Sequence, residues 1–135
     1  MGSSGGSVMA GRIVGRVGLR TEAKSINVES LLDTGATKSY ISSKLADELG
    51  YVKYREPRKV MLAVKNTEGL VIGYLTAAVV INGCELPLEH TFGVVEELRH
   101  DAVIGMDIME PYDIELDVKE GKAKFRKFPP TLEIV

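Results

Sequence analysis

Short stretches of alternating apolar and polar residues dominate this chain. Residues 12–20 and 25–32 alternate in this way on either side of a charged turn at 21–24, which is typical of a β-hairpin. Gly, Asn or Pro interrupts the later stretches at fairly regular intervals, as in all-β barrels and sandwiches. The expected strands are 12–20, 25–32, 59–64, 70–81, 84–88, 91–95, 113–118 and 122–128. The pattern therefore predicts an all-β domain.

Turns and short helices punctuate these strands. Asn82-Gly83 is the strongest hairpin signal, because Asn and Gly tolerate the positive φ angles that a two-residue hairpin requires. Ser42 or Ser43 could cap a helix over 44–49, and Gly50 would end it in the left-handed conformation. A second turn of helix is expected over 106–110, where Pro111 would end it.

The whole-chain properties indicate one folded domain. A length of 135 residues suits about one domain, too short for two similar lobes. Residues 1–8 resemble a leader added for expression, so we expect the domain to span 9–135. The net charge of −2 argues against a nucleic-acid partner, and no apolar run is long enough to cross a bilayer. Cys84, the single cysteine, favours a reducing compartment and hence a cytoplasmic location.

A carboxylate directly after an apolar strand is the most informative local feature. Leu31 and Leu32 precede Asp33-Thr34-Gly35, and a charged side chain at the edge of a core needs a partner or a task. The tripeptide alone would arise by chance in roughly a few per cent of chains of this length, so it carries only moderate weight. Val103-Ile104-Gly105, an apolar-apolar-Gly segment before the second helical turn, adds a second signal.

Both segments, in this order, resemble the motifs of the retropepsin-like aspartic proteases. The resemblance covers about residues 12–128 and implies a closed β-barrel or sandwich with a flap hairpin and one or two short helices. It implies that Asp33 is catalytic. The implied supporting residues are Thr34, Gly35, Ala36, Ile104 and Gly105. At Thr37 and Lys38 the chain departs from many viral members, which carry acidic residues there, so substrate preference cannot be transferred.

The family places its substrate-covering flap at the hairpin formed by 59–64 and 70–81. The implied flap and substrate-binding residues are Met61, Leu62, Ala63, Val64, Lys65, Asn66, Thr67, Glu68 and Gly69. Their apolar members suggest subsites for apolar side chains on both sides of the cleaved bond. An ordinary sheet extension would show the same hairpin pattern.

Peptide hydrolysis without a metal or covalent nucleophile needs a base to activate water and an acid to protonate the carbonyl, and two carboxylates sharing a proton supply both. The chain offers one such residue, so we expect a two-fold symmetric homodimer in which both copies of Asp33 meet, with a polypeptide substrate and no cofactor or metal. The alternative is a catalytically silent dimerisation or peptide-binding module, although such a module would not need the carboxylate.

Other candidate groups are given structural or surface roles. Asp107 is a second carboxylate, but its place on the short helix predicts a solvated side chain rather than a catalytic one. His90 and His100 lack the spacing of a metal site, and Cys84 has no neighbouring histidine. The glycines at 11, 15 and 18 are not followed by Gly-Lys-Ser or Gly-Lys-Thr, which excludes a phosphate-binding loop.

Overall fold

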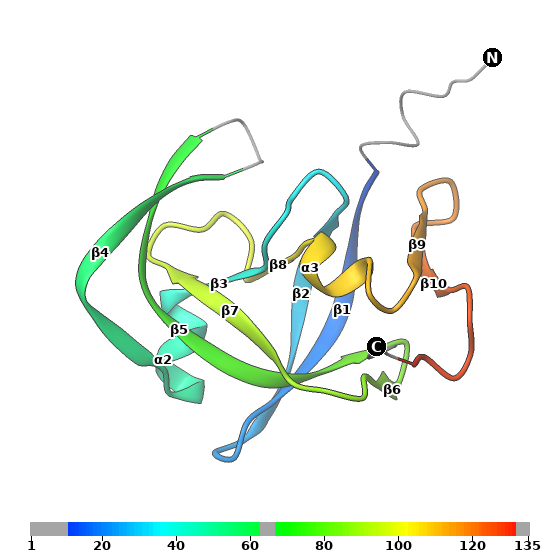
Figure 1. The fold of residues 1–135 in the computed structure, drawn as a ribbon, viewed down its shortest axis with the longest axis horizontal. Coiled ribbons are helices and arrows are strands. Elements are labelled where there is room, and N and C mark those ends of the chain that lie inside the picture. Colours follow the sequence, from blue (N-terminus) through cyan, green and yellow to red (C-terminus); the bar gives the residue numbers. More distant parts are fainter. Residues whose placement is uncertain (1–10, 63–66, 132–135) are drawn as a thin grey trace.

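The computed structural model describes residues 11–62 and 67–131 (Figure 1), and this part of the chain is mostly β. The strands are β1 (Arg12–Arg20), β2 (Ser25–Asp33), β3 (Tyr40–Ser42), β4 (Val52–Leu62), β5 (Thr67–Ile81), β6 (Cys84–Glu85), β7 (His90–Val95), β8 (Ala102–Ile104), β9 (Ile114–Asp117) and β10 (Lys122–Phe125). The helices are α2 (Ser43–Leu49) and α3 (Met106–Met109). The expectation of a mostly β domain with short helices is confirmed.

Seven strands form one sheet in the order β1-β2-β8-β3-β7-β5-β4, and β6 joins it as the eighth strand through β5. β1 also pairs with β5, which closes the strands from β1 to β5 into a ring. β4 pairs with β5 outside this ring and is the outer strand. β2 and β8 run parallel, as do β3 and β7, whereas the other pairs are antiparallel. β9 and β10 form a separate two-stranded sheet.

The core lies inside this ring of strands. β1 and β2 send alternate side chains inward over their first residues, and other elements cover both faces at the end of β2, where Leu31 and Leu32 are both buried. α2 closes one side with Ala46 and Leu49. The largest side chains with essentially no exposure include Leu19, Ile41, Phe92, Ile104, Ile108 and Tyr112. The described part of the chain holds no helix long and apolar enough to cross a membrane.

Local signals placed the caps and turns correctly. Of the two candidate serines, Ser42 caps α2, because its hydroxyl accepts a hydrogen bond from the Leu45 N–H at 3.3 Å. Gly50 ends the helix at a φ of 86°. Asn82 and Gly83 take φ angles of 54° and 76°, which confirms the two-residue hairpin.

Among the strand boundaries that differ from expectation, those of β4 and β6 have a clear physical reason. β4 begins at Val52, well before the predicted start at 59, and it passes through Pro57 with a shift of register between Lys53 and Arg58. An outer strand tolerates proline, because the missing N–H would have faced solvent or fallen in a bulge. β6 covers only Cys84–Glu85 instead of reaching 88, and Pro87 cannot donate to a longer ladder.

Candidate active site

Asp33 is the last residue of β2, and its side chain has no exposed surface. Its Oδ1 accepts a hydrogen bond from the Gly35 N–H at 2.8 Å. Its Oδ2 has no hydrogen-bond partner among the described residues, although Nε of the half-exposed Arg12 lies 3.4 Å away on the paired strand β1. One oxygen is therefore fixed by the backbone, and the other faces a cation without a well-aligned bond.

The residues after Asp33 turn sharply, and we call 33–39 the Asp33 loop. The Ala36 N–H donates to the Asp33 carbonyl oxygen at 3.1 Å. A Cβ on Gly35 would lie 3.2 Å from Asp33 Oδ1, so glycine lets the backbone approach the carboxylate. Thr34 donates both its N–H and its hydroxyl to the Gly11 carbonyl oxygen, at 3.0 and 3.1 Å. The supporting role that the resemblance implies for Thr34 stays a prediction.

The two sequence motifs, separated by about 70 residues, meet in the fold. β8 runs parallel to β2 with Leu31 opposite Val103 and Leu32 opposite Ile104. A Cβ on Gly105 would lie 2.5 Å from the Lys38 carbonyl oxygen, closer than any real Cβ contact, so only glycine lets the backbones meet there. Ile104 is completely buried, and Gly105 places this segment against the backbone of the Asp33 loop.

Asp107 corrects one expectation. Its side chain is half-buried rather than solvated, and both of its oxygens accept hydrogen bonds from Ser39. Ser39 itself is 1% exposed. Sequence reasoning did not single out Ser39, because nothing local pairs a serine with a carboxylate 68 positions away.

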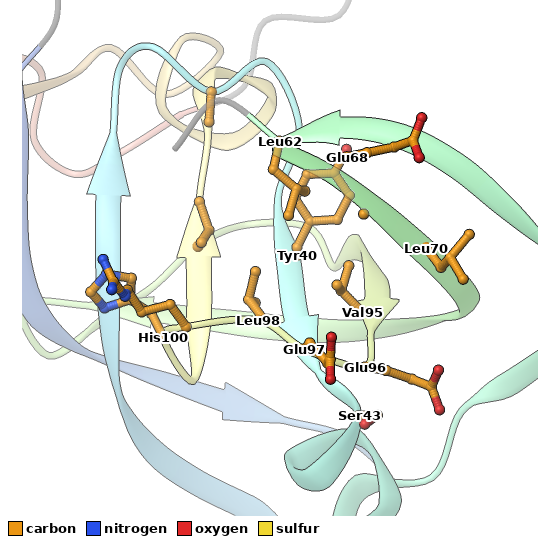
Figure 2. Close-up of a pocket in the computed structure, with 14 residues that line it drawn as sticks. Tyr40, Ser43, Leu62, Glu68, Leu70, Val95, Glu96, Glu97, Leu98 and His100 are labelled. Atoms are coloured by element: carbon orange, nitrogen blue, oxygen red, sulfur yellow. The ribbon is translucent and has the colours of Figure 1, made fainter. Parts of the chain in front are cut away.

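A cavity of about 740 Å³ lies between the Asp33 loop and the β4–β5 hairpin (Figure 2). The loop side contributes Ala36 and Tyr40, and the hairpin contributes Leu62, Glu68, Gly69 and Leu70, while Val95, Glu96, Glu97, Leu98, Arg99 and His100 form a further wall. Burial raises the pKa of the Tyr40 phenol, and the charge of Asp107 raises it further. Residues 96–100 of this wall belong to the connection between β7 and β8.

The predicted flap residues divide into three groups. Leu62, Glu68 and Gly69 line the cavity, whereas Met61 does not and is 59% exposed. Residues 63–66 lie outside the described residues, and so does the side chain of Thr67. The described parts of the hairpin thus place its inner face over the cavity without showing its tip.

His90 has the structural role expected of it. Its Nε2 lies 2.6 Å from the Tyr112 hydroxyl oxygen, and the two rings meet edge to face. Burial lowers the pKa of His90, although the charges of Asp107 and Glu89 oppose the shift. Within residues 11–62 and 67–131, no group of three or more His, Cys, Asp or Glu side chains is placed to hold a metal ion.

Comparisons with known proteins agree with this geometry. Residues 8–111, more than half of the chain, match the family model described as "gag-polyprotein putative aspartyl protease". The retroviral protease-like domain of Ddi1 from Leishmania major superposes with a TM-score of 0.63 at 17% sequence identity, covering 90% of this chain and 94% of that one. A retropepsin-like aspartic protease from Rickettsia conorii gives 0.52 at 17% identity, covering 80% and 86%. None of the curated proteins matches the sequence.

Proposed function

We propose that this chain, which belongs to the retropepsin-like aspartic protease family, is an endopeptidase that hydrolyses polypeptides as a homodimer with one Asp33 from each subunit. The observation that carries the proposal is the Asp33 carboxylate, which is fully buried at a strand end, held by the Gly35 N–H and left with one oxygen lacking a hydrogen bond among the described residues. A buried acceptor of this kind is costly for stability, so a purely structural position would not favour it.

Two such carboxylates brought together would supply the required chemistry. Close carboxylates cannot both ionise readily, so a pair shares one proton and titrates as a unit. The charged member takes a proton from a water molecule while the neutral member donates one to the carbonyl oxygen of the peptide. No covalent intermediate and no cofactor is needed for this reaction.

A second copy is required because the chain supplies a single Asp-Thr-Gly segment. The side of the molecule next to Gly11 and Thr34 leaves space for a partner, since a hollow of about 630 Å³ lies there between the Asp33 loop, α3 and the β9–β10 sheet. That sheet has two strands, so its outer edges are not paired within the described chain. Free edges of this kind support pairing with a second copy.

The cavity beneath the β4–β5 hairpin would then form one half of a substrate cleft. It is bounded by the Asp33 loop through Ala36 and by the hairpin through Leu62 and Leu70. These residues are apolar, which supports the expectation that the subsites accept apolar side chains. A peptide lying between the hairpin and the loop would pass close to both copies of Asp33.

The second candidate function is a silent dimerisation or peptide-binding module. Arg12 favours it, because its Nε lies 3.4 Å from the otherwise unbonded Oδ2 of Asp33 and could make the carboxylate part of an ion pair. Arg12 is half-exposed, so solvent weakens this pair. The protease proposal therefore expects Arg12 to move when a partner and a substrate arrive.

A peptide library incubated with the purified protein at several pH values, together with its sedimentation mass, tests the proposal. We expect cleavage with a bell-shaped pH dependence and an activity that falls more than in proportion on dilution. A fully active monomer would overturn the homodimer. A stable dimer that cleaves no peptide at any pH would favour the silent module.

A further inference from the structure

Ser39 and Asp107 connect the Asp33 loop to α3 through a closed set of hydrogen bonds. The Ser39 hydroxyl donates to Asp107 Oδ1 at 2.7 Å, and the Ser39 N–H donates to Oδ2 at 3.1 Å. The Ser39 oxygen in turn accepts a hydrogen bond from the Gly105 N–H at 2.9 Å. Ser39 therefore links Asp107 to Gly105 by hydrogen bonds, and water has little access to Ser39 because this residue is 1% exposed.

The backbone adds a further connection between the same two segments. The Met106 N–H donates to the Ala36 carbonyl oxygen at 2.7 Å. Gly105 leaves no room for a side chain against the Lys38 and Ala36 carbonyl oxygens, so the two backbones are in direct contact. The Asp33 loop is thus fixed to residues 105–107 at its middle and at its end.

We propose that Asp107 is a positioning residue for catalysis, which acts through Ser39 on the Asp33 loop; this inference rests on the proposed function. An ionised carboxylate only accepts hydrogen bonds, so Asp107 fixes the Ser39 hydroxyl as a donor and directs its lone pairs to the Gly105 N–H. The loop then presents the Gly35 N–H to Asp33 in one geometry. Catalysis depends strongly on such geometry, because a misplacement of about 1 Å can cost about 10²-fold in rate.

The same contacts exclude a different role for this carboxylate. Both oxygens of Asp107 are occupied by donors from Ser39, and they face the rear of the loop rather than the cavity beneath the hairpin. Asp107 does not line that cavity. It therefore does not replace the partner's catalytic carboxylate within one chain.

Asp107→Asn is a sharp probe because it keeps the shape and changes one hydrogen-bonding group. The amide oxygen can accept from the Ser39 N–H, but the NH₂ group then faces the Ser39 hydroxyl. The hydroxyl oxygen would accept from two donors, and its own proton would have no acceptor. Turning the amide over places the NH₂ group against the Ser39 N–H instead, so neither orientation preserves the set.

Kinetics and hydrogen exchange together test the inference. We expect Asp107→Asn to lower kcat by about 10- to 100-fold with little change in KM. Ser39→Ala should have a similar effect, and the double variant should lose no more than the worse single variant, since residues that act as a unit are not additive. The backbone amides of Gly35, Gly105 and Met106 should exchange at least about tenfold faster in Asp107→Asn.

Thr21→Ala is the control for a general loss of stability. Thr21 accepts hydrogen bonds from the Ala23 and Lys24 N–H groups in the β1–β2 turn, at the opposite end of these strands from Asp33. Its removal should lower the melting temperature while leaving kcat and the three amides unchanged.

Additive losses of kcat in the double variant, or a change confined to KM, would overturn the positioning role. Unchanged exchange at all three amides would overturn it as well. The exchange measurement also separates the two proposals. If the wild type cleaves no peptide, the proposed protease activity fails. Amide exchange in Asp107→Asn still tests the contact: faster exchange means that Asp107 holds the loop, and unchanged exchange means that it does not.

Discussion

The Asp33 loop and the β4–β5 hairpin face each other across the same cavity (Figure 2) but are built in opposite ways. Asp33, Ala36 and Ser39 of the loop are buried, and side-chain and backbone hydrogen bonds fix the loop to Gly105 and α3. β4 is an outer strand that pairs only with β5, and most of its residues are exposed. The comparison teaches that this fold anchors the candidate catalytic carboxylate and leaves β4 paired on one side only, a division that the proposed catalysis with a bound peptide would use.

Asp33→Asn tests the rigid side of the comparison and should have the largest effect. Asn cannot take a proton from water, so hydrolysis should fall by at least about 10²–10⁴-fold. The amide oxygen can still accept from the Gly35 N–H, so circular dichroism and sedimentation mass should remain those of the wild type.

Asp47→Asn, the same chemical change on an exposed position of α2, is the matched control and should keep full activity. Cleavage of the best substrate by purified Asp33→Asn at a rate comparable to wild type would exclude the aspartic mechanism.

Gly105→Ala should have the next largest effect, because the new Cβ would lie 2.5 Å from one backbone oxygen and 2.7 Å from another. Neither backbone can yield without moving the Asp33 loop, so the free energy of unfolding should fall by about 1–3 kcal/mol and activity should fall with it. Gly15→Ala is the control, since its Cβ would meet only the end of Leu32 at an ordinary 3.6 Å. Urea unfolding of both variants measures the difference, and equal stability would show that the rear of the loop is less rigid than its contacts indicate.

Sequence patterns predicted those parts of the molecule that depend on neighbouring residues. The β1–β2 hairpin, the Asn82-Gly83 turn and the Ser42 cap follow from local alternation and from the φ angles or hydrogen bonds that single residues favour. The start of β4 could not be predicted, because a strand through Pro57 is acceptable only at the edge of a sheet, and edge position is a property of the whole fold.

The candidate site shows the same limit. The motif around Asp33 carried its own signal, whereas the partnership of Ser39 with Asp107 depends on a side-chain contact across 68 positions. Asp107 was predicted to be solvated because a carboxylate on a short surface helix usually is. The charged residues at 96–100 line the cavity only because the fold turns that loop toward the hairpin.

Leu70→Ser tests the hairpin side of the comparison and should separate binding from stability. Leu70 lines the cavity and is 43% exposed, so its loss should change the free energy of unfolding by no more than about 0.5 kcal/mol. An apolar contact with substrate would be lost, and KM should rise by up to about tenfold, equivalent to about 1.4 kcal/mol. Leu88→Ser is the control, because Leu88 is 45% exposed and does not line the cavity. Equal KM values for the two variants would remove Leu70 from the substrate cleft.

The smallest expected effect lies outside both regions, at the pair formed by His90 and Tyr112. Burial holds the pKa of His90 below its ordinary value, so between the folded and unfolded pKa values the unfolded chain binds more protons. The contribution of His90 to the free energy of unfolding is therefore fully present above its pKa in the unfolded chain, about 6.5. It is lost as the pH falls through the lower pKa of His90 in the folded chain. The wild-type free energy of unfolding should fall between pH 7.5 and 5, and His90→Gln should make this fall smaller, as measured by urea unfolding. His100→Gln is the control, because it keeps the pair of His90 with Tyr112 and should show the same fall as the wild type. Neither His90 nor Tyr112 lines the hairpin cavity, so kcat and KM at pH 7.5 should match the wild type. A changed kcat would mean that His90, on which the charge of Asp107 acts, is coupled to the Asp33 loop.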